Sequence, residues 1–122
     1  MLVLYVDDHP LNHSVMKGVI GILKFDLRVA NNAFEGLDMI EQNKFDLVLM
    51  DLHMPGMDGV EAIKRIRARE DEKANVPIIV VTADTGHEAK VKSLEAGAQN
   101  FMLKPIGIKT MIDTISGVLP ID

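Results

Sequence analysis

The amino-acid sequence predicts a doubly wound α/β domain, in which a five-stranded parallel sheet carries helices on both faces. Five short apolar segments recur along the 122 residues, and most of them are continuous runs, as in strands buried on both faces. The segments between them show helical spacing or helix-capping residues. Strands that alternate with helices in this way form parallel sheets with right-handed crossover connections.

Each predicted strand is a short run of mainly apolar residues that ends at a polar or small residue. In chain order, the strands are expected at residues 2–6, 26–30, 45–50, 77–82 and 100–104. Runs of this length are typical of strands rather than of helices. We therefore expect five strands separated by five helices.

The segments between the strands carry signals of helix termini. Pro10 suits the first turn of the first helix, because proline needs no amide donor there. The next three helices begin with the spacing of a capping box, in which a side chain accepts a hydrogen bond from the amide three residues later. The pairs are Asn32 with Glu35, Asp58 with Glu61, and Thr85 with Glu88.

The last three helices differ in their apolar faces. The third has the clearest helical spacing, through Val60, Ile63 and Ile66. The fourth, GHEAKVKSLEAG at residues 86–97, is thinly apolar, and we expect Val91 and Leu94 to anchor it and Gly97 to end it. Weak anchoring is typical of an element that can move. The fifth helix is expected within residues 109–119.

Composition argues against several classes of function. Thirteen basic and eighteen acidic residues give a formal net charge of −5, so we expect no direct binding to nucleic acid. The absence of cysteine excludes disulfides and thiol nucleophiles. Acidic residues follow the amino terminus too soon for a signal peptide, and no apolar run approaches the roughly 20 residues of a membrane span. We expect one cytoplasmic domain over residues 1–122, without membrane insertion and without an output domain.

Reactive side chains follow the predicted strands, at the sheet edge where such folds bind ligands. Asp7 and Asp8 follow the first strand, Asp51 follows the third, and Thr82 and Lys104 end the fourth and fifth. Three clustered carboxylates repel one another unless a cation lies among them, and Mg²⁺ prefers such oxygen ligands. Lys104 would add a positive charge and Thr82 a hydrogen bond to a phosphoryl group. Asp51 would be the nucleophile and form an aspartyl phosphate.

These motifs give the chain a resemblance to the receiver domains of two-component response regulators. The resemblance covers about residues 2–119 and rests on DD at 7–8, DLHMPGMDG at 51–59, VVTAD at 80–84 and KPI at 104–106. Each motif is weak alone, but four in order, each at a strand end, are specific. The resemblance implies a flavodoxin-like sheet with the strand order 2-1-3-4-5, which is the order known for this family.

The resemblance also implies the chemistry of the site. Asp51 would accept a phosphoryl group from a histidine kinase or a histidine phosphotransfer protein. The carboxylates of Asp7, Asp8 and Asp51 and the backbone carbonyl of His53 would hold Mg²⁺. His53 and Asp84 would tune the lifetime of the phosphoryl group. The domain would thus catalyse its own phosphorylation and slow dephosphorylation, and would not be a conventional enzyme.

Further residues are implied to transmit the signal. Thr82 and Phe101 would be a switch pair, in which the hydroxyl moves toward the phosphoryl group and the ring turns inward. They would act on a protein-binding surface built from the fourth helix, the fifth strand and the fifth helix. The bond between Lys104 and Pro105 would be cis, and the small Ala83 would leave room for the phosphoryl donor.

The histidines near the first helix have a simpler interpretation. His9 and His13 lie four residues apart, a spacing that can bind zinc. Because no third ligand is near in the sequence, we interpret them as part of a solvated helix end. His87, at the start of the fourth helix, is expected to face water.

Other functions fit parts of the pattern. A phosphatase of the haloacid dehalogenase type would carry its nucleophile in a D-x-D motif at the first strand, whereas this chain has adjacent Asp7 and Asp8. A flavodoxin-like FMN binder would need hydroxyls and backbone donors there. A degenerate receiver acting as a constitutive protein-binding module would not need the complete Asp, Thr and Lys set. The residues leave open whether the domain stands alone or belongs to a hybrid kinase, and which protein target or covalently linked domain it controls.

Overall fold

The structure, a computed structural model, describes residues 1–119. Residues 120–122, the last of the predicted domain, lie outside the described residues. The elements follow in the order β1 (Leu2–Val6), α1 (Pro10–Ile22), β2 (Asp26–Ala30), α2 (Ala33–Gln42), β3 (Leu47–Met50), α3 (Gly59–Arg67), the 3₁₀ helix η1 (Glu72–Asn75), β4 (Ile78–Thr82), α4 (His87–Ala96), β5 (Asn100–Leu103) and α5 (Ile108–Ser116). The five predicted strands are confirmed, and each begins within two residues of its predicted start.

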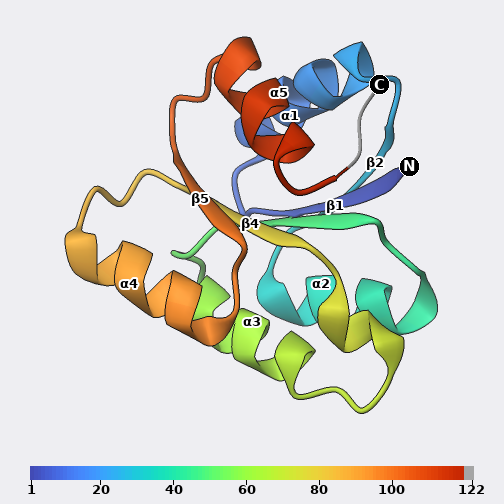
Figure 1. Ribbon diagram of the computed structural model, residues 1–122, viewed down its shortest axis with the longest axis vertical. Helices are drawn as coiled ribbons and strands as arrows, with labels where there is room; N and C mark the ends of the chain where they lie inside the picture. Colours follow the sequence, from blue (N-terminus) through green and yellow to red (C-terminus); the bar gives the residue numbers. More distant parts are fainter. Residues whose placement is uncertain (120–122) are drawn as a thin grey trace.

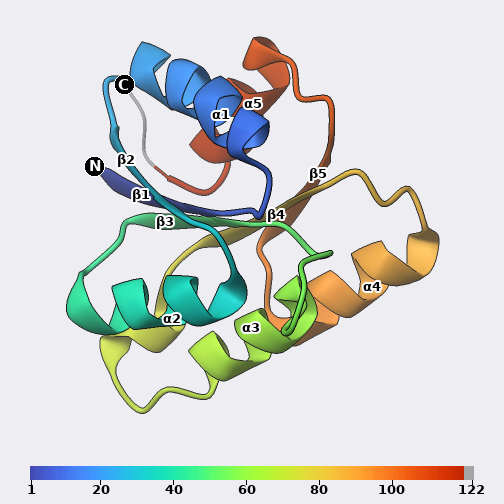
Figure 2. The same cartoon turned by 180° about the vertical axis from the view of Figure 1, so that it is seen from behind.

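The five strands form one parallel sheet in the order β2-β1-β3-β4-β5, which confirms the order that the resemblance implied. Helices α1 and α5 cover one face, and α2, α3 and α4 lie on the other (Figures 1 and 2). Each face has its own apolar core, and the central strands β1, β3 and β4 contribute to both. Within residues 1–119, no helix combines the length and the apolarity needed to cross a membrane.

Two of the three predicted helix caps are confirmed. The side chain of Asn32 accepts a hydrogen bond from the amide of Glu35 at 2.8 Å, and that of Asp58 accepts one from the amide of Glu61 at 2.9 Å. The prediction for Thr85 is wrong: α4 begins one residue later, after Gly86, and no side chain among the described residues caps it. Instead, the side chain of Asp84 accepts a hydrogen bond from the Gly86 amide at 2.8 Å. This bond shapes the turn that leads into α4.

The predicted anchors of α4 are also wrong. Val91 and Leu94 are 36% and 41% exposed. Of the α4 residues, all of which the structure describes, Ser93 alone is buried, and Ala89 and Ala96 pack beside it against the core. These three residues share one helix face by their spacing of four and three. The helix therefore places its small side chains against the core. Its larger side chains, Val91 and Leu94, face outward.

Candidate functional site

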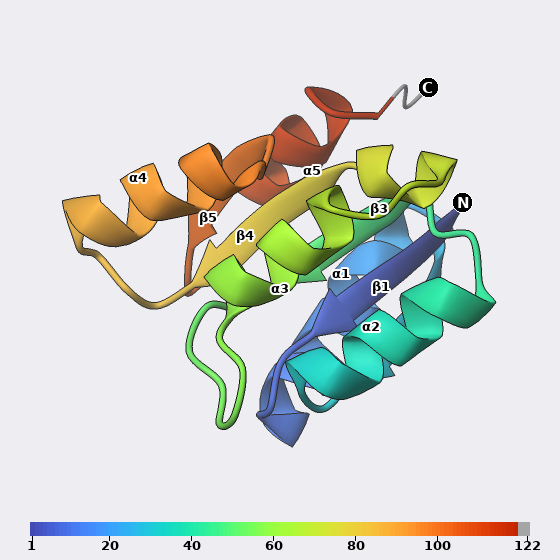
Figure 3. The same ribbon diagram turned by 90° about the horizontal axis from the view of Figure 1, so that it is seen from below.

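The carboxyl edge of the sheet gathers the residues that the sequence singled out. Asp7 follows β1, Asp51 follows β3 and Thr82 ends β4, and all three are buried. Lys104 follows β5 and reaches back across this edge. In Figure 3 the connections after β3 and β4 leave the sheet at the same edge. Residues separated by almost the whole chain therefore meet there, because parallel strands end on the same side.

Lys104 lies at the centre of this arrangement. Its Nζ donates to Asp7 Oδ2 at 2.6 Å and to Asp51 Oδ2 at 3.1 Å. Burial by itself would lower the pKa of Lys104, but the bonds to the two carboxylates outweigh it and raise that pKa above its usual value. Lys104 is thus held as a cation between the two acids. The peptide bond between Lys104 and Pro105 is cis.

Asp7 is fully buried and surrounded by donors. Its Oδ2 accepts hydrogen bonds from Lys104, from the hydroxyl of Tyr5 at 2.5 Å and from the side-chain amide of Asn12 at 3.2 Å. Its Oδ1 accepts one from the amide of His9 at 2.8 Å. Burial alone would raise the pKa of Asp7, but these bonds, led by that of Lys104, lower it below its usual value. Asp7 therefore stays ionised inside the protein.

Asp8 offers the position most open to a cation. Its Oδ1 atom is buried and makes no hydrogen bond with any described residue, although His9 Nδ1 lies 2.9 Å away and would form an ion pair with it when protonated. Ligand atoms of Asp7, Asp8 and His9 lie within 4.8 Å of one another. Within the described residues Asp51 does not belong to that group, but Lys104 bridges it to Asp7. Hard oxygen donors with one buried, unpaired oxygen fit Mg²⁺.

Asp51 is held by the loop that follows it. Its Oδ1 accepts a hydrogen bond from the amide of Leu52 at 2.7 Å. Gly59, at the start of α3, packs against this turn so closely that an added Cβ would lie 2.2 Å from the carbonyl oxygen of Asp51. Gly56 in the same loop has φ +88°, a conformation that glycine adopts without strain. The DLHMPGMDG motif thus fixes the position of Asp51 through its glycines.

The two residues implied as a switch pair lie on the same face of the sheet. Phe101 pairs in register with Val80, and Thr82 follows Val80 by two residues, so both side chains point to one side. Thr82 Oγ1 accepts a hydrogen bond from the amide of Asp84 at 3.3 Å. Phe101 is half-buried, packs against the core beside α4, and lines a cavity between α4, β5 and α5.

His53 and Asp84 contact each other directly, between the loop after β3 and the loop after β4. His53 Nε2 donates to Asp84 Oδ2 at 2.6 Å, which joins the loop after β3 to the loop after β4. This bond, and then that from the Gly86 amide, lowers the pKa of Asp84 below its usual value. Both side chains line a cavity of about 330 Å³ that reaches along α3 and α4. Proximity in the sequence did not predict this pairing, because 31 residues separate the partners.

The sequence did not predict that three further residues contact Asp7. Tyr5, Asn12 and His13 all bind Asp7, the last through Nε2 to its backbone carbonyl at 2.5 Å. The interpretation of His13 as solvated is therefore wrong, since it is half-buried against the Tyr5 ring, whereas His9 and His87 are exposed. One signal was available: Tyr5 and Asp7 alternate on a strand and so point to one side.

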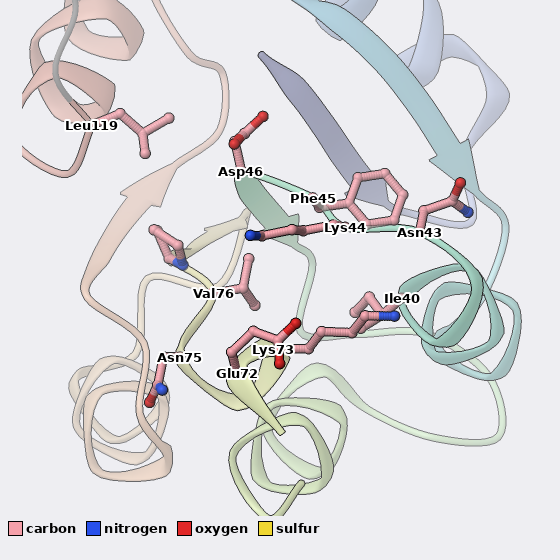
Figure 4. Close-up of a pocket in the computed structure, with 11 residues that line it drawn as sticks. Ile40, Asn43, Lys44, Phe45, Asp46, Glu72, Lys73, Asn75, Val76 and Leu119 are labelled. Carbon is pink, nitrogen blue, oxygen red and sulfur yellow. The ribbon is translucent and has the colours of Figure 1, made fainter. Parts of the chain in front are cut away.

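A separate cavity of about 390 Å³ lies at the opposite end of the sheet. Figure 4 shows side chains from the α2–β3 connection, from η1 and from the η1–β4 connection around it, among them Lys44, Asp46, Lys73 and Val76. It contains none of the residues at the carboxyl edge. The chemistry of the site is thus not located in this cavity.

Known proteins share both the sequence and the fold. The family model for the response regulator receiver domain matches residues 3–116. The chain is 34% identical over 116 residues to the sensor histidine kinase RcsC of Escherichia coli, covering 95% of this chain and 12% of that protein, so it spans about an eighth of that relative. It is 29% identical to chemotaxis protein CheY-3 of Vibrio cholerae, covering 97% of this chain and 91% of that protein.

Solved structures agree in fold. A putative response regulator from Chloroflexus aurantiacus superposes with a TM-score of 0.90 at 27% identity, covering 96% of this chain and 95% of that one. The receiver domain of a Pseudomonas aeruginosa sensor histidine kinase, which has magnesium coordinated in its active-site cleft, gives 0.87 at 26% identity with 96% and 95% covered. The chain therefore belongs to the response regulator receiver domain family of two-component systems.

Proposed function

We propose that this domain accepts a phosphoryl group on Asp51 from the phosphohistidine of a histidine kinase or a histidine phosphotransfer protein. One observation carries the proposal: Lys104 Nζ lies 2.6 Å from Asp7 and 3.1 Å from Asp51, beside Asp8 with its unpaired oxygen. A buried ammonium next to the acceptor carboxylate stabilises the negative charge of an incoming phosphoryl group.

The transfer is a displacement at phosphorus. A carboxylate oxygen of Asp51 forms the new bond to phosphorus, while the P–N bond of the phosphohistidine breaks and the imidazole leaves with its electron pair. Lys104 and the hydroxyl of Thr82 donate hydrogen bonds to the phosphoryl oxygens. In hydrolysis a water oxygen attacks phosphorus, the bond to Asp51 breaks, and inorganic phosphate leaves as the carboxylate is restored.

The site fits Mg²⁺ as its cofactor. The carboxylates of Asp7, Asp8 and Asp51 and the backbone carbonyl of His53 would hold the ion. The buried, unpaired oxygen of Asp8 supports this assignment, as does the magnesium in the P. aeruginosa receiver domain. When bound, the ion would neutralise charge on the phosphoryl oxygens.

His53 and Asp84 are proposed to set the lifetime of the aspartyl phosphate. Their 2.6 Å bond joins the loops that follow Asp51 and Thr82, where a polar bridge could act on an attacking water. Replacing both residues with leucine would remove this polar bridge. We expect the decay rate of the phosphorylated domain to change, as followed by intact mass over time. An unchanged rate would remove this role.

Phosphorylation is proposed to change the surface built from α4, β5 and α5, with Thr82 and Phe101 as the link. The small apolar area that α4 buries supports this, because its face toward the core is made of small side chains. The target would be a downstream protein or a covalently linked domain. Amide chemical shifts should change along α4 and β5 on phosphorylation. Changes confined to the loops around Asp51 would contradict this route.

The face of α1 supports a protein as the phosphoryl donor. Leu11, Val15 and Ile22 are 75%, 58% and 54% exposed, and their spacing places them on one side of the helix. This apolar stripe begins two residues after His9, at the edge of the site. We propose that the histidine-bearing partner covers it while it presents its phosphohistidine to Asp51.

Intact mass spectrometry after incubation with acetyl phosphate tests the proposed function. We expect a phosphoryl adduct that depends on Mg²⁺, is labile to base, and is lost in Asp51→Asn. If the wild-type domain forms no adduct under any of these conditions, the proposal fails, and a constitutive protein-binding role would then explain the fold.

A further inference from the structure

The buried hydroxyl of Tyr5 has no part in the chemistry described above. Tyr5 lies next to the last residue of β1, a strand flanked by β2 and β3, and is almost completely buried. Its ring packs in the core beneath α1 and α5 and meets His13 edge to face, with centroids 6.1 Å apart. Its hydroxyl donates to Asp7 Oδ2 at 2.5 Å. A buried phenol usually finds a partner, but here the partner is a site carboxylate.

Tyr5 and Lys104 bind the same oxygen of Asp7. Lys104 Nζ lies 2.6 Å from Asp7 Oδ2 and 3.1 Å from Asp51 Oδ2, so it is closer to Asp7. Asn12 adds a longer bond of 3.2 Å to the same Asp7 oxygen. A phosphoryl group on Asp51 places new negative oxygens beside Lys104, and these draw the ammonium away from Asp7.

This movement would leave a fully buried carboxylate without its ammonium partner, which is costly unless other donors remain. We propose that Tyr5 is a positioning residue that keeps Asp7 satisfied and in place while Lys104 moves from Asp7 to the phosphoryl group on Asp51. The hydroxyl of Tyr5 thereby frees Lys104 for the phosphoryl group. This inference rests on the proposed function of Asp51.

Tyr5→Phe tests the proposal, because it removes the hydroxyl and keeps the ring. Without the hydroxyl, Asp7 depends more strongly on Lys104, which is then less available to Asp51. We expect phosphorylation by acetyl phosphate to slow by about tenfold, the worth of one hydrogen bond to a charged group. Asn12→Ala removes the longer bond and should slow the reaction less.

Phe45→Leu is the matched control for lost stability. Phe45 is buried at the opposite end of the sheet, beside the cavity of Figure 4. We expect this variant to be less stable than Tyr5→Phe and still to react at the wild-type rate. If both variants slow equally, the effect reflects stability and the proposal fails. A wild-type rate in Tyr5→Phe would also overturn it.

Tyr5 also reports on its own hydrogen bond, since the chain has one tyrosine and no tryptophan. Fluorescence excited at wavelengths that phenylalanine does not absorb therefore comes from Tyr5 alone. As Lys104 leaves Asp7, the bond from Tyr5 strengthens, so the emission should fall when acetyl phosphate and Mg²⁺ are added. It should not fall in Asp51→Asn. Unchanged emission in a wild-type sample that carries the adduct would contradict the movement of Lys104, whereas absence of the adduct would contradict the proposed function instead.

Discussion

Helices α1 and α4 both begin beside the acidic site, but they are attached to the sheet in different ways. Three large buried residues of α1, Met16, Val19 and Ile20, pack into the core that α1 shares with α5. Helix α4 packs through Ser93, with Ala89 and Ala96 beside it. Because stabilisation scales with the apolar area buried, α1 is fixed more firmly than α4.

The polar contacts show the same difference. At the amino end of α1, Asn12 and His13 bind Asp7 directly, so the helix and the acidic site form one unit. At the amino end of α4, the connection runs through the exposed pair of His53 and Asp84. One side of the site is thus rigid, and the other can respond to what happens at Asp51.

The largest expected effect comes from truncating an anchor of α1. Ile20→Ala leaves a cavity beneath the helix, and we expect it to lower the free energy of unfolding by about 2–5 kcal/mol. Leu94→Ala on α4 is the matched control, because this side chain is 41% exposed, and it should change stability by less than about 1 kcal/mol. Urea unfolding measures both. Equal losses of unfolding free energy in the two variants would contradict the conclusion that α1 is attached more firmly than α4.

The carboxyl end of α4 is held from a neighbouring helix. The guanidinium of Arg67 on α3 donates to the carbonyls of Gly97, Ala74 and Val76 at 2.7–3.0 Å. Arg67→Met leaves these carbonyls unpaired, so we expect a loss of about 2 kcal/mol.

Hydrogen exchange should show faster opening of α4 than of α1 in Arg67→Met. The control is Arg65→Met on the same helix, since Arg65 makes an exposed ion pair with Glu61. Such a pair contributes less than about 1 kcal/mol to the free energy of unfolding. If exchange in Arg67→Met rises equally in both helices, Arg67 does not hold α4 in particular.

Helix α3 has a side-chain cap and α4 has none among the described residues, and we expect this difference to have a smaller effect on stability than the loss of Arg67. Asp58 caps α3, so Asp58→Ala should cost about 1 kcal/mol in unfolding free energy. Thr85 lies one residue before the start of α4 and caps nothing in the described structure. Thr85→Ala should therefore stay within about 0.5 kcal/mol of wild type. A loss near that of Asp58→Ala would show that Thr85 stabilises α4 after all.

The last expected effect depends on pH and concerns Asp7 and Asp84: it is fully present at neutral pH and disappears in acid. Both pKa values are lower in the folded protein than the usual 3.8, so each ionised carboxylate stabilises the fold above that pH. The contribution is lost as the pH falls below about 3.8 toward the folded value. Asp7 is buried and Asp84 is more exposed, so Asp7→Asn should flatten the acid decline of stability more than Asp84→Asn.

Urea unfolding of the three proteins between about pH 2 and pH 7 checks this expectation. An equal change in the pH dependence of the two variants would mean that solvent screens both carboxylates alike. That result would contradict the expectation drawn from the burial of Asp7.

Features that depend on a few successive residues were predictable. The strands could be located because each is a local apolar run, and Asn32 and Asp58 could be assigned as caps because the bond spans three residues. The convergence of Asp7, Asp51 and Lys104 followed once parallel strands were predicted, because all of them end at one edge.

Features that depend on neighbouring elements were not predictable. Helix α4 is too weakly amphipathic for its sequence to select a face, so α3 and β5 decided that Ser93 turns inward and Leu94 outward. The bonds of Tyr5 and His13 to Asp7, and of His53 to Asp84, depend on distances that exist only in the folded chain.

The sequence by itself determined the strands, most of the helix starts and the chemical identity of the acidic site, since local hydrogen bonding and burial are encoded over short stretches. Only the tertiary structure decided which donors surround Asp7, which face α4 buries and which side of the site is rigid. These depend on the balance among several packed elements, and no single segment contains that information.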